Sequence, residues 1–356
     1  MREYGNSKTN EWVNRLIWGD NLPVLEALIH DSQVFGKVRL IYIDPPFATN
    51  QTFRIGNGGR TATISSSDYD DHAYHDKILG RDYIEFLRKR VALLRELLAD
   101  DGSIYVHIDC KVGHYVKVML DEVFGQENFI NDITRIKCNP KNFSRKGYGN
   151  LKDMILFYSK SKDYIWNEPH VKMADEEILR LFPKVDKNGN RYTTTPLHAP
   201  GETRNGKTGQ LWKELLPPKG RHWRVSPEEL DKLDKAGRIE WSSTGNPRRI
   251  IYAHEKVLKG KKLQDIWEFK DPQYPSYPTE KNLDMLKLIV EASSNPNDIV
   301  LDCFAGSGTT LVAAERKGRR WIGIDSSQAA IRVIENRMLF EGKFSPISVF
   351  RVDEDL

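Results

Sequence analysis

Residues 299–310 read Ile-Val-Leu-Asp-Cys-Phe-Ala-Gly-Ser-Gly-Thr-Thr, and this stretch decides the fold class. A short apolar run ends at the carboxylate of Asp302 and breaks into a turn that holds Gly306 and Gly308. The residues that follow, 309–316, have the spacing of a helix. A buried strand, a glycine turn and a helix in this order are typical of a parallel sheet that binds a ligand at its strand ends.

Apolar runs alternate with helical patterns along most of the chain. Strands are predicted at 38–43, 103–108, 154–158, 299–301 and 321–324, and helices at 83–98, 282–292, 309–316 and 328–339. This alternation predicts an α/β fold with a doubly wound, mainly parallel sheet.

Two stretches interrupt the alternation. Residues 48–81 are rich in Gly, Ser, Thr and Asp, and a loop of this length is expected to be a lid or partly disordered. Residues 161–265 contain several Pro and Gly breaks and are expected to form an inserted small domain. The insert separates residues 1–160 from residues 266–356.

Composition excludes several classes of protein. The three cysteines lie far apart without a Cys-x-x-Cys pair, so neither a metal site nor a disulfide framework is predicted. No run of 18 apolar residues occurs, and a cytoplasmic protein without a membrane partner is expected. Residues 135–270 carry 29 Lys and Arg against 17 Asp and Glu. Such a surplus is compatible both with a surface that faces a polyanion and with a solvated lysine-rich insert.

The glycine turn fits neither of two common nucleotide motifs. No lysine follows the second glycine, as a P-loop requires, and the third glycine of a dinucleotide fingerprint is missing. A nucleoside ligand is still favoured, because Asp325 ends the strand predicted at 321–324, 17 residues after Gly308. An acidic residue at this place commonly accepts hydrogen bonds from a ribose. The alternative for Asp325 is a helix N-cap before Ser326.

A second strand, predicted at 38–43, ends in Asp44-Pro45-Pro46-Phe47. Two prolines stiffen the backbone and prevent extension of the strand ladder. The turn can hold the carboxylate of Asp44 and the carbonyl of Pro45 side by side, which suits the two hydrogens of an exocyclic amine. Phe47 could stack on a planar base. The alternative is a rigid end to a strand, as in any α/β protein.

The two motifs in this order resemble those of the β class of DNA amino-methyltransferases that depend on S-adenosylmethionine, a class whose motif order is circularly permuted. The resemblance covers residues 15–50, 80–160 and 265–340. It implies a Rossmann-like fold in which 1–160 is the catalytic half, 161–265 the target-recognition insert and 266–356 the cofactor-binding half. It also implies double-stranded DNA as substrate, with the target base flipped out of the duplex.

The resemblance assigns roles to individual residues. Asp44 and Pro45, in the motif completed by Pro46 and Phe47, would engage the target base. The residues that would bind the cofactor are Asp20, Asn21, Thr279, Lys281, Asn282, Asp302, Phe304, Ala305, Gly306, Ser307, Gly308, Thr309 and Asp325. The place of the family lysine ahead of the cofactor strand is taken here by Tyr277, with Lys281 nearby.

The basic stretch suggests where DNA is contacted. Lysines and arginines that lie beside aromatic residues and glycines suit phosphate contact and base stacking. The candidates are Lys141, Arg145, Lys146, Lys219, Arg221, Arg224, Arg248 and Arg249. Trp212, Trp223 and Trp241 are instead expected to form the small core of the insert.

Several alternatives stay open from the sequence. Asp44 favours adenine N6 as the target, since family members acting on cytosine N4 usually carry Ser at this position. An amine methyltransferase acting on RNA or on a protein amide is a second reading, although protein-amide enzymes typically show Asn-Pro-Pro-Tyr. A DNA-binding or modification subunit that needs a partner for activity is a third. A specificity subunit, a second methyltransferase subunit, a cognate restriction enzyme or a second copy could be the partner.

Overall fold

The computed structural model describes residues 2–4, 12–46, 52–55, 71–75, 80–140, 144, 146–257, 260–275, 277–278, 280–341 and 346–352. The chain divides into two compact units. Unit 1 comprises Met1–Pro169 and Gln264–Leu356, and unit 2 comprises His170–Leu263.

Unit 1 is built on one ten-stranded sheet with the order β1-β20-β2-β19-β18-β3-β6-β8-β7-β17. In that order the strands are β1 (Arg2–Tyr4), β20 (Ile347–Arg351), β2 (Asn14–Trp18), β19 (Arg320–Asp325), β18 (Ile299–Asp302), β3 (Val38–Ile43), β6 (Leu98–Ile108), β8 (Lys152–Ser159), β7 (Phe129–Ile136) and β17 (Ile266–Trp267). Neighbours from β20 to β6 are parallel, whereas β8 is antiparallel to both β6 and β7. The predicted mainly parallel, doubly wound sheet is confirmed.

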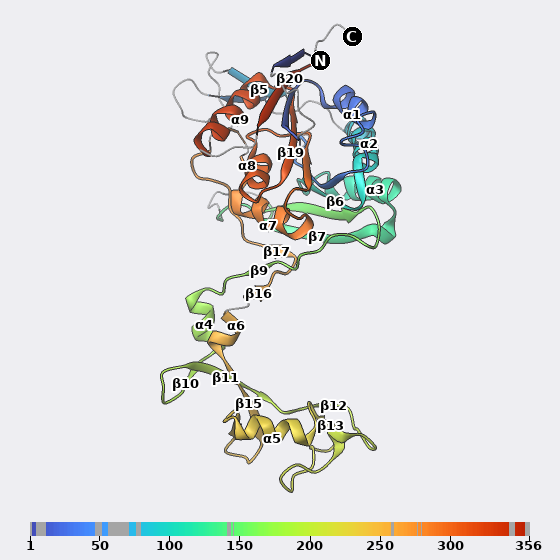
Figure 1. Ribbon diagram of the computed structural model, residues 1–356. Coiled ribbons are helices and arrows are strands. Elements are labelled where there is room, and N and C mark those ends of the chain that lie inside the picture. Colours follow the sequence, from blue (N-terminus) through green and yellow to red (C-terminus); the bar gives the residue numbers. More distant parts are fainter. Residues whose placement is uncertain are drawn as a thin grey trace. The chain divides into compact units, whose positions relative to one another are not determined.

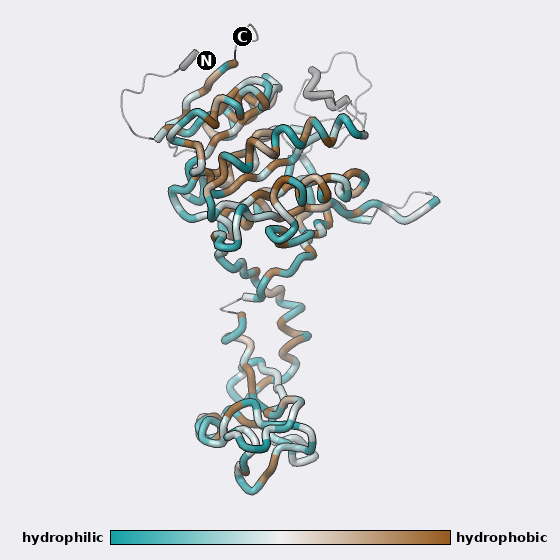
Figure 2. Tube along the Cα trace, turned by 90° about the vertical axis from the view of Figure 1, so that its right-hand side faces the viewer, coloured by the Kyte–Doolittle hydropathy of each residue, from teal (hydrophilic) through white to brown (hydrophobic). Residues whose placement is uncertain are grey.

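Helices cover both faces of this sheet. In Figure 1, α1 (Asn21–Ile29), α2 (Gly80–Leu97) and α3 (Gly113–Phe124) lie on one side, and α7 (Leu283–Ser293), α8 (Thr309–Arg316) and α9 (Gln328–Glu341) on the other. A short 3-10 turn, Gln126–Asn128, follows α3. Because both faces are covered, the central strands are apolar on both, and Ile41, Val300 and Ile322 are fully buried. Figure 2 shows hydrophobic and hydrophilic residues alternating along the helices of this unit, as expected for helices that bury one face.

Most of the predicted elements are confirmed within one or two residues at each end, and α8 spans the predicted 309–316. Helices α1 and α3 were not predicted. In α3 the buried residues Val116, Met119, Leu120 and Phe124 have helical spacing, so the signal is present in the sequence. Within the expected lid at 48–81, an antiparallel pair forms from β4 (Thr52–Ile55) and β5 (Asp71–His75). The rest of that stretch up to residue 79 lies outside the described residues.

Unit 2 is an α+β unit with its own small core. Its elements are β9 (His170–Val171), α4 (Asp175–Leu181), β10 (Lys184–Val185), β11 (Arg191–Pro196), β12 (His198–Pro200), a 3-10 turn (Lys207–Gly209), β13 (Arg221–Trp223), α5 (Pro227–Lys235), β14 (Ile239–Trp241), β15 (Pro247–Tyr252), α6 (Ala253–Val257) and β16 (Lys261–Lys262). The main sheet has the antiparallel order β10-β11-β15-β14.

The core of unit 2 contains two of the three tryptophans expected there. Trp212 and Trp223 are buried with Leu197 and Leu230. Trp241 is 44% exposed, so the expectation of a core position is wrong for this residue. It lies on the edge strand β14 and stacks on Trp212 at 5.8 Å between ring centroids. Within the described residues, no helix combines the length and the apolar character that crossing a membrane requires.

Candidate active site

The candidate site lies where two parallel strands end side by side. β3 and β18 are neighbours with Ile41 opposite Leu301, so Asp44 and Asp302 follow at the same edge of the sheet. From β18 the chain passes through α8 to β19, and from β3 it passes through α2 to β6, in the opposite direction. The two helices therefore cover opposite faces, as Figure 1 shows. Doubly wound sheets bind their ligands at such a switch point.

The glycine turn after β18 has a backbone that other residues rarely adopt. Gly306 and Gly308 have φ values of 51° and 74°, in the left-handed region. A Cβ atom at Gly308 would lie 2.7 Å from Cγ1 of Ile334 in α9, so this glycine is required for close packing. A Cβ atom at Gly306 would meet nothing closer than 3.9 Å. A Cβ atom at Gly306 would thus make only ordinary van der Waals contacts, and the lack of a side chain there would let a ligand approach the backbone.

Two predicted cofactor residues stabilise the turn itself. The hydroxyl groups of Ser307 and Thr309 are buried and hydrogen bonded to each other at 2.9 Å. Arg337 of α9 donates to the carbonyl of Ser307 at 2.9 Å and to Oγ1 of Thr309 at 3.2 Å. Ala305, also predicted, is buried and donates its N–H to the carbonyl of Ile324 at 3.0 Å. These contacts fix the shape of the turn.

Asp302 is a buried carboxylate with an unusual titration. Burial raises its pKa to about 7, and the charges of Asp44 and Asp325 add to this effect. Hydrogen bonds from Thr310 and from the N–H of Phe304 act in the opposite direction. Three carboxylates thus influence one another at the ends of neighbouring strands. Such a site favours a cationic ligand, because a positive charge stabilises the ionised form of each carboxylate.

The carboxylate of Asp325 joins the glycine turn to the segment that precedes α9. Its Oδ2 accepts the N–H of Gly306 at 2.7 Å, and its Oδ1 accepts the N–H of Ser327 at 2.8 Å, just before α9 begins. Burial raises the pKa of this carboxyl. The N-cap position of α9 belongs to Ser327, whose carbonyl accepts the N–H of Ile331 and whose Oγ accepts the N–H of Ala330, so the alternative of an N-cap is wrong for Asp325. Each carboxylate oxygen can accept a further hydrogen bond, and the ribose contact stays a prediction.

Asp44 is paired on one oxygen only. Lys281, whose residue exposure is 8%, forms an ion pair with Oδ2 of Asp44. Oδ1 of Asp44 is buried and has no hydrogen-bond partner among the described residues. A buried acceptor without a donor costs about 1–3 kcal/mol, so a donor from a ligand would be favourable at this oxygen. The structure thus brings Lys281, predicted to contact the cofactor, to the target-base motif.

Arg90 in α2 is a site residue that the sequence analysis misses. It is buried and donates to Oδ1 of Asn21 at 2.5 Å and to Oδ1 of Asp20 at 2.9 Å. Asn21 in turn donates to the carbonyl of Cys303 at 2.7 Å. The start of α1 is thereby tied to the end of β18. The sequence contains a signal for this position, because Arg90 lies three residues after Leu87 and therefore on the buried face of an amphipathic helix.

Aromatic rings border the same end of the sheet. The ring centroids of Phe304 and Phe86 are 6.3 Å apart. The guanidinium carbon of Arg90 lies 3.6 Å from the centroid of Phe86. Phe304, predicted to line the cofactor site, is only partly buried and keeps an accessible surface next to Asp302.

Other predicted residues have different positions. Asn282 caps α7, because its Oδ1 accepts the N–H of Met285 at 3.1 Å and its Nδ2 donates to the carbonyl of Lys270 at 2.9 Å. Phe47 and Thr279 lie outside the described residues. Pro45 is buried and Pro46 partly buried, directly after β3.

A buried polar network lies beside the motif that carries Asp44. The hydroxyl of Tyr42 is 2.7 Å from Nδ1 of His107, whose Nε2 is 3.3 Å from Oδ2 of Asp153. Burial lowers the pKa of His107, which keeps the ring neutral at pH 7. Burial alone would raise the pKa of Asp153, but the contacts with His107 and Lys137 hold it well below its ordinary value. The network fixes neighbouring strands below the candidate site.

The predicted DNA contacts are distributed over both units. Lys146 is exposed in unit 1, and Lys141 and Arg145 lie outside the described residues. The remaining candidates are in unit 2: Lys219, Arg221, Arg224, Arg248 and Arg249.

The sequence has recognisable relatives. It is 47% identical over 330 residues to the type II methyltransferase M.EcaI of Enterobacter cloacae, covering 91% of this chain and 69% of that protein. It is 27% identical to the Mod subunit of the type III restriction-modification enzyme StyLTI of Salmonella typhimurium, of which the chain spans about half the length, 49%. Among solved structures, the complex of M1.HpyAVI with S-adenosylmethionine aligns over 91% of this chain and 98% of that one, with 18% identity and a TM-score of 0.47.

Residues 38–336 match the model of the family described as DNA methylase, which includes both motifs and the whole of unit 2. Together with the 47% identity to M.EcaI, this match identifies the family. The chain belongs to the restriction-modification-like N6/N4 DNA methyltransferases, whose methyl donor is S-adenosylmethionine.

Proposed function

We propose that the chain methylates the N6 amino group of adenine in double-stranded DNA. The observation that carries the proposal is a buried acceptor that has no donor among the residues that the structure describes. Oδ1 of Asp44 is buried without a donor, while Lys281 pairs with Oδ2 and holds the carboxylate in place. An exocyclic amine offers the N–H donor that this oxygen lacks.

The amine of adenine is a weak nucleophile because its lone pair is delocalised into the ring. Hydrogen bonds from its two hydrogens to Asp44 and to the carbonyl of Pro45 would favour a pyramidal nitrogen whose lone pair is available. No covalent intermediate on the enzyme is required, since Cys303 is buried and burial raises the pKa of its thiol. Positioning and electrostatic stabilisation would supply most of the rate enhancement.

A base inside a duplex cannot reach a carboxylate that is buried at a strand end. The target adenine must therefore leave the stack, which costs roughly a few kcal/mol. We assign stacking on the flipped base to Phe47 and covering of the base to the stretch 48–81. We assign chemistry to the two halves of unit 1, and target reading to unit 2.

The residues of the turn fit the cofactor. S-adenosylmethionine supplies the methyl group when it is bound. Its positive charge suits the carboxylates of Asp302 and Asp325; burial raises the pKa of Asp302, and the charges of Asp44 and Asp325 add to this. The lack of a side chain at Gly306 allows close approach to the backbone. Asn21, held by Arg90 and Cys303, would define one wall of this binding site.

The test is methyl transfer by the purified chain. DNA is incubated with the protein and S-adenosylmethionine, digested to nucleosides and separated by chromatography. N6-methyladenine is the expected product, and N4-methylcytosine in its place would contradict the adenine assignment. Methylation by the purified chain alone would also show that no partner subunit is needed. An RNA of the same sequence serves as control and should remain unmodified.

The affinity for S-adenosylmethionine is expected to rise with pH through about 7. Asp302 titrates near pH 7 in the free protein, because burial raises its pKa. A bound cation favours the ionised carboxylate, so the pKa in the complex is lower. The affinity for S-adenosylmethionine therefore reaches its maximum above pH 7 and falls as the pH decreases below 7. If binding lowers the pKa by one unit, the affinity changes by about tenfold.

Calorimetric titration between pH 5.5 and 8.5 measures this dependence. Asp302→Asn provides the matched control, because it removes the titrating group and leaves any titration of the ligand unchanged. The pH dependence of the wild type should exceed that of the variant by the contribution of Asp302. Equal pH profiles would show that this carboxylate does not face the cofactor.

A further inference from the structure

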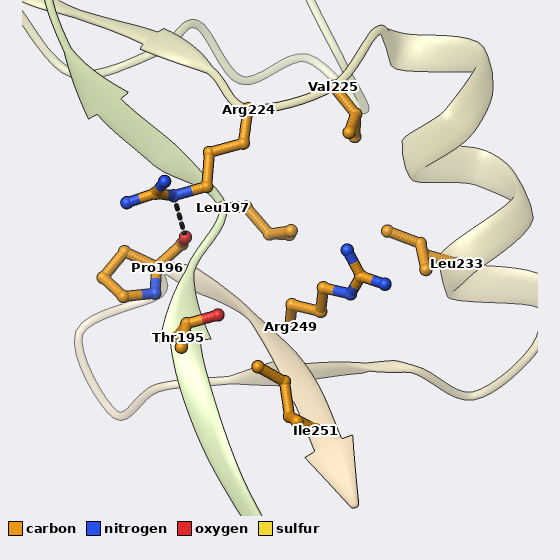
Figure 3. Close-up of a pocket in the computed structure, with 8 residues that line it drawn as sticks. All are labelled: Thr195, Pro196, Leu197, Arg224, Val225, Leu233, Arg249 and Ile251. Carbon is orange, nitrogen blue, oxygen red and sulfur yellow. Dashed lines mark hydrogen bonds between the residues drawn. The ribbon is translucent and has the colours of Figure 1, made fainter. Parts of the chain in front are cut away.

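Unit 2 contains a cavity of about 240 Å³ between its main sheet and α5. Apolar side chains form most of its wall: Leu197, Val225, Leu233 and Ile251. Thr195, Pro196, Arg224 and Arg249 complete the lining. In Figure 3, α5 closes one side and the strand that carries Arg249 the other. The volume is smaller than the roughly 300–1,000 Å³ typical of small-molecule sites, which argues against an ordinary small-molecule ligand.

Arg224 and Arg249 line this cavity, and Arg221 and Arg248 lie nearby in sequence, in β13 and β15. His198 lies beside three of them: burial lowers the pKa of its imidazole, and the positive charges of Arg221, Arg224 and Arg248 lower it further. Arg249 is the fourth, on β15 next to Arg248. None of the four has a carboxylate within 4.0 Å among the residues that the structure describes.

Other basic residues of unit 2 are neutralised. Lys184 is paired with Glu240, Lys213 with Asp234, and Arg238 with Glu255. Arg221, Arg224 and Arg248, whose charges act on His198, and Arg249 on the cavity wall thus form a local excess of positive charge. An excess of this kind attracts a polyanion.

Three of the arginines are held in place by the protein. Nε of Arg224 donates to the carbonyl of Pro196 at 3.1 Å. Arg248 donates to Oγ1 and to the carbonyl oxygen of Thr194 at 2.9 and 2.8 Å. Arg221 lies 3.2 Å from Nδ1 of His198. These side chains keep free N–H groups in a fixed orientation, which suits contact with phosphates.

Arg249 is different, because it points into the cavity. Figure 3 shows its guanidinium between Leu197 and Leu233, whereas Arg224 is directed toward Pro196. Arg249 is opposite Thr195 in the pairing of β11 with β15, and alternation along the strand places Ile251 on the same face. No hydrogen bond or ion pair engages its guanidinium within the described part of the chain. Five donors are therefore available above an apolar wall.

We propose that Arg249, an exposed side chain on the wall of this cavity, recognises a guanine of the target sequence from the major groove. The inference rests on the proposed DNA substrate. Guanine presents two acceptors, O6 and N7, to the major groove, and an arginine fork matches both. Adenine presents a donor at N6, which would face another donor. Arg221 and Arg224 contact neighbouring phosphates.

The experiment compares target sequences before and after substitution. The purified full-length chain methylates a DNA library of random sequence, and the modified sites are read by sequencing. Arg249→Gln is expected to reduce the preference for guanine at one position by roughly 10–100-fold. Arg249→Lys keeps the charge and loses the fork, and is expected to give the same loss. Both variants are checked for folding by their unfolding midpoints.

Two further variants separate base reading from general attraction. Arg224→Gln is expected to preserve the target sequence and to weaken DNA binding. The slope of the logarithm of the binding constant against the logarithm of the salt concentration should become smaller by about 1. Arg238→Gln is the matched control within unit 2, because Arg238 is already neutralised by Glu255, and it should change neither property.

The results that would overturn this inference differ from those that would overturn the proposed function. Suppose that the wild type methylates DNA. If the folded Arg249→Gln variant then has the same target sequence as the wild type, the proposed role of Arg249 is overturned. A wild type that methylates no DNA would overturn the function, and the library is then sorted by binding alone. In that case, the proposed role of Arg249 is overturned if the bound sequences show no guanine preference, or if Arg249→Gln leaves that preference unchanged.

Discussion

Asp44→Asn is expected to reduce the rate of methyl transfer by at least about 10²–10³-fold, as when one preorganised polar group is removed from an active site. Asparagine has the shape of aspartate but can present an N–H₂ group to the target amine. It also loses the charge that pairs with Lys281, which is buried. The charge of Lys281 would then no longer be offset by Asp44 near the amine, where positive charge develops.

Single-turnover kinetics with saturating DNA and S-adenosylmethionine measure the effect on the chemical step. Cofactor affinity, measured separately, should change far less, because Asp44 is assigned to the target base. Asp100→Asn is the matched control, since its side chain is 98% exposed. A variant at Asp44 that keeps the wild-type rate would refute the proposed contact with the amine.

Gly308→Ala is expected to destabilise the fold and to abolish cofactor binding at ordinary concentrations. A left-handed φ of 74° costs an alanine about 1–2 kcal/mol. The added Cβ would also lie 2.7 Å from Ile334, and overpacking costs typically about 1–3 kcal/mol more. Relief of this contact requires the turn or α9 to move. Because the turn shapes the cofactor site, the movement should reduce affinity as well as stability.

Gly318→Ala separates the two contributions. Gly318 has a φ of 69°, but a Cβ atom there would meet nothing within 4 Å, so only the backbone cost applies. Urea unfolding should show a clearly larger loss for Gly308→Ala than for Gly318→Ala. Gly306→Ala, also without a close contact, should match Gly318→Ala in stability yet weaken cofactor binding. Equal stability for all three variants would contradict the packing argument.

The sequence was sufficient for the elements that carry the two motifs. β3, β18 and α8 were predicted close to their observed bounds, because apolar runs that end at Asp44 and Asp302 are local signals. The order of the motifs was also enough to indicate the family that the comparisons identify. Trp241 shows the limit of such reasoning, since whether a tryptophan is buried depends on which strand lies at the edge of a sheet.

Only the tertiary structure decided which side chains act together. Lys281 pairs with Asp44 across more than two hundred residues of chain, and Arg90 reaches Asn21 from another helix. Hydrophobic spacing is a property of neighbouring residues, whereas an ion pair depends on the register in which distant elements pack. The sequence therefore determined the sheet, the turn and the chemistry of the two motifs. The packing of the elements determined the charge balance, the titration of Asp302 and the acceptor left open on Asp44.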